Sequence, residues 1–417
     1  MTGSPRARVG LISLGVGLAA AGLGAAVGLA AERAAMGRPV LPRRGRARSE
    51  DYGSVRGEQH TVAADDGTEL YVEVDEADPR ATLRSDPPSD AQPDTQSDGA
   101  TPRTEPAAPP ITVVLCHGYS LTMDAWHYQR KALRGRYRVV LWDQRGHGRS
   151  ASGEPASATI DQAGRDLARV LDAVAPDGPL ILVGHSMGGM AIMSLAHEQP
   201  ELFADRVLGV ALVSTSAGGL GSMDLGIAVL GRFVPRLVPG TAALLARKPG
   251  LVDRGRRLGS DLETVLVRRY SFASPVPEEL VRFCAEMIAA TRFKVISDFL
   301  PAFGGHDKRE ALAALDGIEV LVLVGDGDLI TPVAHSEEIV RMLPGAEHVI
   351  VASAGHLVML EHPGVVNAHL DDLVRRAVRA AGHRGRRPGR GDGKDRVSRP
   401  RSVVTPLRRR GRRHGAA

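Results

Sequence analysis

The chain has 417 residues, of which 43% are hydrophobic, and a formal net charge of +5 at neutral pH; this length allows one large domain or two. Both ends are basic: residues 382–417 contain 13 Lys or Arg and two Asp, and residues 1–50 contain eight Arg and two Glu. Because the ends carry more positive charge than the whole chain, the middle must be acidic. Two cysteines, Cys116 and Cys284, are too few for a disulfide framework, no Cys/His cluster indicates a metal site, and no cofactor is expected.

An apolar segment without a charged residue runs from residue 9 to residue 31, longer than the roughly 20 residues that a helix needs to cross a bilayer. Three interpretations are open: a retained single-span anchor, a cleaved secretory signal that begins with Arg6 and Arg8, or a soluble apolar helix. The length favours an anchor, followed by a basic linker up to residue 50. Six arginines lie within 33–48, so the positive-inside rule favours a cytoplasmic location for the domain that follows the segment; secretion after cleavage is the alternative.

A folded domain is predicted over residues 51–381. It begins with a β-hairpin, in which residues 61–63 and 70–74 flank the turn Asp65-Asp66-Gly67. Residues 78–110 are rich in Pro, Asp, Ser and Thr and nearly devoid of apolar residues. Such a segment cannot bury enough surface to offset its ordering entropy, so we predict a disordered insertion in a surface loop.

Apolar strands then alternate with amphipathic helices. Six strands are expected, at 111–116, 137–142, 179–183, 207–213, 320–324 and 348–351. Alternation of this kind favours a parallel sheet with helices on both faces. Residues 217–305 interrupt it and are interpreted as a helical lid. The last helix is expected at 363–381, and residues 382–417 are predicted to be a disordered basic tail, which could bind anionic lipid or nucleic acid non-specifically.

The sequence Gly184-His185-Ser186-Met187-Gly188 lies between the strand 179–183 and a helix. A G-x-S-x-G pattern in this setting is typical of a serine held on a strained turn, with its hydroxyl exposed above the sheet. The flanking glycines allow the turn because they carry no Cβ. We therefore predict Ser186 as a nucleophile; a helix N-cap serine without chemistry is the alternative.

A serine nucleophile needs a base and an acid that orients the base. In this strand order the acid follows the next-to-last strand and the histidine follows the last. Asp326 and Asp328 compete for the acid, and Asp328 is favoured because a helix begins shortly after it. His356 follows strand 348–351 and is favoured as the base over the other histidines near strand ends, which are His117, His147 and His185.

Acyl transfer also requires donors for the oxyanion of the tetrahedral intermediate. One is expected to be the backbone N–H of Met187, directly after the nucleophile. The other is expected from the loop after strand 111–116, where His117-Gly118 makes a tight turn and the N–H of Tyr119 is the best candidate.

With these motifs the chain resembles the α/β-hydrolase fold family, in its serine esterase and lipase-like branch, which includes cofactor-free peroxidases. The matching motifs are HGY at 117–119, DQRGHGRS at 143–150, GHSMGG at 184–189, GDGDLITP at 325–332 and AGH at 354–356. The resemblance spans roughly 58–381 and implies a mostly parallel eight-stranded sheet flanked by helices, with an inserted lid. It also implies Ser186, Asp328 and His356 as the catalytic set, and a mainly structural role for the stretch 143–150.

The function expected from these residues is hydrolysis of a carboxylic ester through an acyl-enzyme. An apolar stretch of the lid (Leu225, Ile227, Val229, Leu230, Phe233 and Leu237) suggests a hydrophobic or acyl substrate. The same site could instead hydrolyse an amide, peptide or thioester, or form a peracid. A third hypothesis is a non-catalytic scaffold. Relatives that open epoxides or remove halide use an aspartate at the position of Ser186, so those reactions are not expected.

Overall fold

The computed structural model describes residues 50–78, 110–220, 265–384 and 401–405. The predicted membrane segment at 9–31, nearly all of the insertion predicted at 78–110, and the lid stretch that suggested a hydrophobic substrate lie outside these ranges. Among the described residues, no helix is both long enough and apolar enough to span a bilayer.

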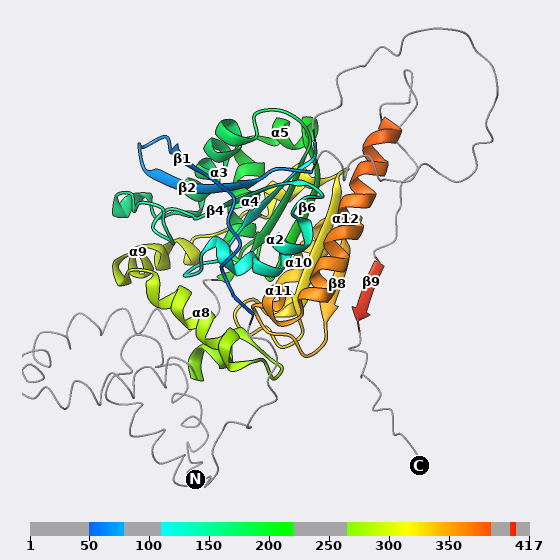
Figure 1. Cartoon of the computed structure of the whole chain (residues 1–417). Helices are drawn as coiled ribbons and strands as arrows, with labels where there is room; N and C mark the ends of the chain where they lie inside the picture. Colours follow the sequence, from blue (N-terminus) through cyan, green and yellow to red (C-terminus); the bar gives the residue numbers. More distant parts are fainter. Residues whose placement is uncertain (1–49, 79–109, 221–264, 385–400, 406–417) are drawn as a thin grey trace, which may run out of the picture.

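A single mixed sheet forms the centre of the domain, with the order β1-β2-β4-β3-β5-β6-β7-β8-β9 (Figure 1). Antiparallel pairing is confined to β1 with β2 and β2 with β4, and every pair from β4 to β9 is parallel. The strands are β1 Glu58–Ala63, β2 Glu69–Asp75, β3 Thr112–Cys116, β4 Arg138–Trp142, β5 Leu180–His185, β6 Val207–Val213, β7 Glu319–Gly325, β8 Glu347–Val351 and β9 Arg401–Thr405.

The first eight strands form the predicted eight-stranded, mostly parallel sheet. The hairpin β1–β2 is confirmed, with Val62 opposite Leu70. Its turn closes where the Ala64 N–H donates to the Thr68 carbonyl at 2.9 Å, and Gly67 adopts a φ of +80°, which glycine tolerates without strain.

Helices cover both faces of the sheet. They are α2 His127–Leu133, α3 Ile160–Val174, α4 Met187–Glu198, α5 Pro200–Asp205, α10 Val333–Met342, α11 Val358–Glu361 and α12 Pro363–Arg384, with short 3-10 turns η2 Met123–Trp126, η3 Pro155–Ser157 and η5 Glu310–Leu315. One buried cluster joins the sheet to α3, α4, α5 and α10, and a second joins it to α2, α11 and α12.

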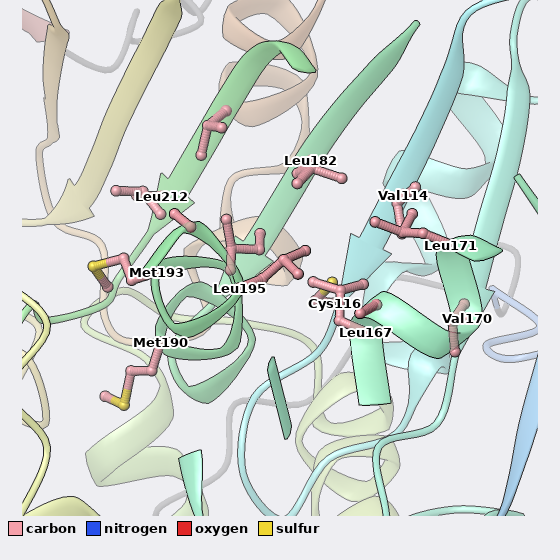
Figure 2. Packing of buried hydrophobic residues seen from close by; sticks show 14 of the residues in the cluster. Val114, Cys116, Leu167, Val170, Leu171, Leu182, Met190, Met193, Leu195 and Leu212 are labelled. Carbon is pink, nitrogen blue, oxygen red and sulfur yellow. The ribbon is translucent and has the colours of Figure 1, made fainter. Parts of the chain in front are cut away.

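Figure 2 shows the first cluster. Its β3, β5 and β6 residues alternate along each strand, so that every second side chain meets α3 or α4. The other side chains of the same strands belong to the second cluster, which explains why β3, β5 and β6 are almost continuously apolar. Labelled members are Val114, Cys116, Leu182 and Leu212 from the strands, Leu167, Val170 and Leu171 from α3, and Met190, Met193 and Leu195 from α4.

Helix α3 begins after a threonine cap, Thr159. The side chain of Thr159 accepts the N–H of Gln162 at 3.0 Å, which satisfies one of the free donors of the first turn. The Gln162 amide nitrogen donates to Asp65 in the hairpin turn at 2.6 Å. Gln162 therefore ties α3 to the hairpin.

The described part of the predicted lid is helical. Residues 265–271 are helical, and α8 Glu278–Ala290 and α9 Phe293–Gly304 follow. Buried residues of α8, such as Cys284, join the second cluster, whereas Val295 and Phe299 of α9 join the first. Figure 1 shows α8 and α9 grouped at the lower left of the molecule, below the hairpin β1–β2.

The prediction of a disordered tail from residue 382 is wrong at two places. Helix α12 continues to Arg384, and residues 401–405 form β9, which pairs in parallel with β8. The segment Arg401-Ser402-Val403-Val404-Thr405 is rich in β-branched residues, which favour strands. The outer edge of β8 would otherwise expose unpaired backbone groups, and pairing with β9 satisfies them.

Candidate active site

The predicted site residues lie at the carboxyl edge of the parallel strands, in the loops that follow β3, β5, β7 and β8. Four non-glycine residues in the described chain have a positive φ, and each follows a strand at this edge: Ser120, Ser186, Ser214 and Ser353, after β3, β5, β6 and β8. Backbone strain in non-glycine residues persists only where the surrounding structure enforces it, and it clusters at functional sites. Here it is concentrated on one edge of the sheet.

Ser186 occupies the turn between β5 and α4, with φ +50° and ψ −118°. Its N–H donates to the Val213 carbonyl at 3.0 Å, and its carbonyl accepts the hydroxyl of Thr215 at 2.7 Å. It stands at the N-cap position of α4, yet its side chain makes no capping hydrogen bond. Ser186 therefore does not form the side-chain cap of the alternative interpretation, and helix capping does not occupy its hydroxyl.

The two glycines around Ser186 are required by close backbone contacts. A Cβ on Gly184 would lie 2.5 Å from the backbone nitrogen of Gly189, and a Cβ on Gly188 would overlap the carbonyl of Cys116. Backbone atoms cannot move aside as a flexible side chain can. The turn is thus as tight as the G-x-S-x-G pattern predicts.

Asp328 and His356 are in direct contact. Nδ1 of His356 donates to the Asp328 carboxylate, 2.9 Å from Oδ2 and 3.1 Å from Oδ1. The same carboxylate accepts the N–H groups of Ile330 at 2.8 Å and Thr331 at 2.9 Å, and the Thr331 hydroxyl at 2.9 Å. Asp326, the competing acid, is exposed, and among the described residues its carboxylate accepts only the N–H of Ala354, at 3.4 Å.

The environment keeps the Asp328 carboxylate ionised. Burial raises its pKa, but the adjacent imidazole of His356 and the donated hydrogen bonds outweigh burial, so that the pKa lies below its ordinary value. An ionised carboxylate on Nδ1 fixes the imidazole tautomer and leaves Nε2 as the nitrogen that can take up a proton. This is the electrostatic arrangement of a base with its orienting acid.

His185 links the serine turn to the histidine loop. Its Nε2 donates to the backbone carbonyl of His356 at 3.0 Å, and the two rings lie 4.7 Å apart between centroids. Full burial lowers the pKa of His185 well below its ordinary value, so the ring is neutral. This contact across 171 positions was not predicted from the sequence, in which His185 was only a competing candidate for the base.

The loop after β3 lies against the serine turn. A Cβ on Gly118 would be 3.2 Å from the Cβ of Ser186 and 2.5 Å from Nδ1 of His185. The next residue is Tyr119, the candidate oxyanion donor. Met187, the other candidate, is the first residue of α4, and the first N–H groups of a helix have no partner within the helix.

The side chain of Tyr119 points to the lid. Its hydroxyl donates to the carbonyl of Ile296 in α9 at 2.5 Å, and its ring packs against Phe303 and His147 at centroid distances of 5.0 Å and 5.9 Å. Burial raises the pKa of the phenol. The residue proposed to supply an oxyanion donor is therefore anchored by a helix of the lid, a link that no sequence signal indicated.

The remaining histidines near strand ends are structural. Nε2 of His117 accepts the N–H of Gln144 at 2.9 Å, and burial lowers its pKa to about 3. Burial likewise lowers the pKa of His147 to about 4, and its Nδ1 donates to the carbonyl of Arg145 at 2.9 Å. No group of three or more metal-binding side chains occurs in the part of the chain that the structure describes.

The stretch 143–150 is structural, as the resemblance implied. Asp143 accepts the N–H groups of Met123 at 2.8 Å and Arg149 at 2.9 Å, and burial raises its pKa to about 6. Arg145 forms a buried ion pair with Asp166 at 2.6 Å. These contacts hold the loop after β4 beside the candidate site.

The chain matches the family model of the alpha/beta hydrolase fold over residues 111–363. This match covers more than half of the chain, and the chain belongs to the α/β-hydrolase family.

Individual relatives match only part of the chain, at modest identity. The chain is 30% identical over 267 residues to the dihydrolipoyllysine-residue acetyltransferase component of the acetoin cleaving system of Cupriavidus necator, which covers 62% of each protein. The chain thus spans less than two thirds of that relative's length. It is 38% identical over 96 residues to a protein of Caulobacter sp. named as a carbamate hydrolase, over 23% of this chain and 35% of that protein.

Solved structures share the fold. An esterase from Thermogutta terrifontis has a TM-score of 0.56 at 22% identity and covers 77% of this chain and 99% of its own. A bromoperoxidase from Bacillus anthracis gives 0.55 at 19% identity, over 76% and 100%. An enol-lactonase from Burkholderia xenovorans gives 0.55 at 22% identity, over 76% and 100%.

Proposed function

We propose that this α/β hydrolase is a serine hydrolase that cleaves a carboxylic ester through an acyl-enzyme intermediate, with Ser186 as nucleophile, His356 as base and Asp328 as orienting acid. One observation carries the proposal. His356 is bonded through Nδ1 to the Asp328 carboxylate, and its loop is bonded to the turn that holds Ser186 in a strained, uncapped conformation.

The reaction would follow from this arrangement. The Ser186 hydroxyl loses its proton to Nε2 of His356 while its oxygen attacks the ester carbonyl carbon, and the N–H groups of Met187 and Tyr119 stabilise the negative oxygen. Collapse of this intermediate breaks the ester bond, and the departing alcohol takes the proton from His356. Water then attacks the acyl group by the same route and releases the acid and Ser186.

A fluorophosphonate probe tests the proposal directly, because it labels a serine only when a base activates the hydroxyl. The wild-type protein should be labelled at Ser186 and should hydrolyse p-nitrophenyl esters. Ser186→Ala should lose both activities and keep its fold. Ser194→Ala, which removes another buried serine hydroxyl of the same helix, is the matched control and should retain labelling. An unlabelled wild-type protein with native circular dichroism would contradict the proposal.

A second candidate keeps the same residues but changes the bond or the attacking group. The relative named as a carbamate hydrolase and the neighbouring bromoperoxidase favour testing amide, carbamate, thioester and peroxide-dependent turnover beside ester hydrolysis. A panel of p-nitrophenyl esters of increasing acyl length would test the preference for a hydrophobic substrate.

A non-catalytic scaffold remains as the third candidate, and retention of the biological role by Ser186→Ala would favour it.

We also propose that the apolar segment 9–31 tethers the hydrolase to a membrane, with the domain on the cytoplasmic side, and that the basic tail contacts anionic lipid or nucleic acid. Only the sequence supports these two points. Membrane fractionation with and without residues 1–49 tests the tether, and protease protection in sealed vesicles tests the side.

A further inference from the structure

The loop of His356 is held by bonds on both sides of the histidine. The N–H of Gly355, immediately before it, donates to Oε2 of Glu361 at 2.6 Å. The N–H of Leu357, immediately after it, donates to the carbonyl of Ser271 at 2.9 Å. Ser271 lies in the predicted lid range, so part of the support for the base loop comes from the lid.

Glu361 holds the same part of the lid through its other oxygen. Oε1 accepts the N–H of Ala273 at 3.0 Å, the N–H of Ser274 at 2.5 Å and the hydroxyl of Ser274 at 2.6 Å. One carboxylate thus bonds the lid with Oε1 and the base loop with Oε2. A carboxamide cannot do both, because only one of its two terminal atoms is an acceptor.

The surrounding backbone leaves little room for the two segments to move independently. A Cβ on Gly355 would lie 2.6 Å from the carbonyl oxygen of Ser271, and a Cβ on Gly327 would lie 2.6 Å from the Cβ of Ala273. Gly327 directly precedes Asp328. The lid segment 271–274 therefore packs on the loop of the base and on the loop of the acid.

We propose that Glu361 is a positioning residue for the base, which places His356 by tying the backbone before it to the lid segment 271–274. The inference rests on the proposed serine-hydrolase function. In the part of the chain that the structure describes, Glu361 bonds only backbone groups and the Ser274 hydroxyl, so it acts through His356 and not on a reacting atom. Docking of segment 271–274 and alignment of the imidazole are then coupled. Displacement of this segment would misalign His356 and make it a less effective base.

This role has a kinetic signature that a purely structural role lacks. A contact that only binds substrate changes KM, whereas a misplaced base lowers kcat and the rate at which the serine reacts. The reduction should also appear with small probes, such as p-nitrophenyl acetate and a methyl fluorophosphonate, whose short acyl or alkyl group offers the lid little to bind.

Glu361→Gln in the full-length protein tests the proposal. The carboxamide oxygen can still accept the lid donors, but the NH2 group then faces the N–H of Gly355, so that this hydrogen bond is lost. We expect kcat for p-nitrophenyl acetate and the labelling rate of Ser186 to fall about ten-fold, with KM changed less than two-fold. Ser274→Ala, which removes one bond on the lid side only, should cause a smaller reduction. Glu338→Gln, which removes a carboxylate of α10 that pairs with Arg309, is the matched control and should behave as wild type.

Hydrogen exchange of the same variants tests, without using activity, whether Glu361 links the lid segment 271–274 to the loop of His356. In Glu361→Gln, exchange of peptides that contain Gly355 and Ala273 should accelerate together, by about ten-fold, while the peptides of β5 stay protected. Unchanged exchange at Gly355 in Glu361→Gln would overturn the proposal. A fall in kcat that is fully explained by a smaller fraction of folded protein would overturn it too. An unlabelled wild-type protein would instead contradict the proposed serine-hydrolase function. The exchange result would still decide whether Glu361 couples the two segments.

Discussion

At the residue scale, the candidate site depends on which atom each side chain presents. Asp328 and Asp326 are two positions apart, yet only Asp328 reaches His356. The carboxylate of Asp328 is bound by the backbone of Ile330 and Thr331, which turns it toward Nδ1. The identity of the acid is thus a consequence of the local turn after β7.

Asp328→Asn should nearly abolish catalysis while leaving the fold intact. A carboxamide can present its donor to Nδ1 and hold the imidazole in the wrong tautomer, an effect that lowers kcat about 10⁴-fold in a serine protease. Asp326→Asn is the matched control, because Asp326 is exposed and does not contact His356 in the described structure. Steady-state kinetics of both variants check the assignment, and equal losses in the two variants would contradict it.

At the element scale, single polar residues join segments that are distant in the chain. Asp143 follows β4 and accepts the N–H of Met123 at the start of η2. Tyr119 joins the β3 loop to α9. The motifs that contain these residues were recognisable in the sequence, but their partners were not, because a hydrogen bond between distant segments leaves no periodic pattern.

The buried carboxyl of Asp143 should make stability depend on pH. Burial raises its pKa to about 6, above the roughly 3.9 of an unfolded aspartate. A raised pKa adds stability that is fully present below the unfolded value and is lost as pH rises through about 6. Two units of pKa correspond to at most about 3 kcal/mol.

Urea unfolding of Asp143→Asn and wild type between pH 4 and pH 7 measures this contribution. The variant should be less stable throughout, since each carboxyl oxygen has a lone pair that can accept an N–H in either protonation state, whereas the carboxamide nitrogen has none. The difference in unfolding free energy between the two proteins should nevertheless shrink as pH rises. Asp172→Asn, at a side chain that is 66% exposed, should follow the wild-type curve, and parallel curves for Asp143→Asn and wild type would contradict the prediction.

At the scale of the whole molecule, one sheet with helices on both faces places the loops of β3, β5, β7 and β8 on one edge. Parallel strands in a covered sheet have their carboxyl ends together, and ligand sites form there. The family match and the solved structures agree with this architecture. The ninth strand extends the sheet at the far side of β8, away from the hairpin.

Removal of residues 385–417 should leave activity on p-nitrophenyl esters largely unchanged, because β9 lies at the edge of the sheet and beyond the last proposed catalytic residue. It should also expose the β8 edge and promote self-association, since an unpaired strand edge is a template for pairing. Light scattering of the truncated protein measures this effect. A chain that ends after Thr405 keeps β9 and is the control; equal association of the two forms would contradict a protective role for β9.

Most of the architecture could be predicted from the sequence because the relevant signals are local. Alternating strands and helices, the turn residues of the hairpin and the strand–serine–helix order each lie within about 20 residues. The resemblance to α/β hydrolases rests on five such short motifs. What these signals could not show was the end of the chain, where α12 runs to Arg384 and β9 pairs with β8.

The sequence by itself determined the fold class and the residues that should do the chemistry, because strand and helix patterns and the order of serine, aspartate and histidine are read along the chain. Only the tertiary structure decided which groups support them: His185 on the carbonyl of His356, Tyr119 on α9, and Glu361 between the lid and the base loop. These contacts join residues that fall side by side only after the sheet has formed. Their geometry depends on packing between elements, which no local pattern encodes.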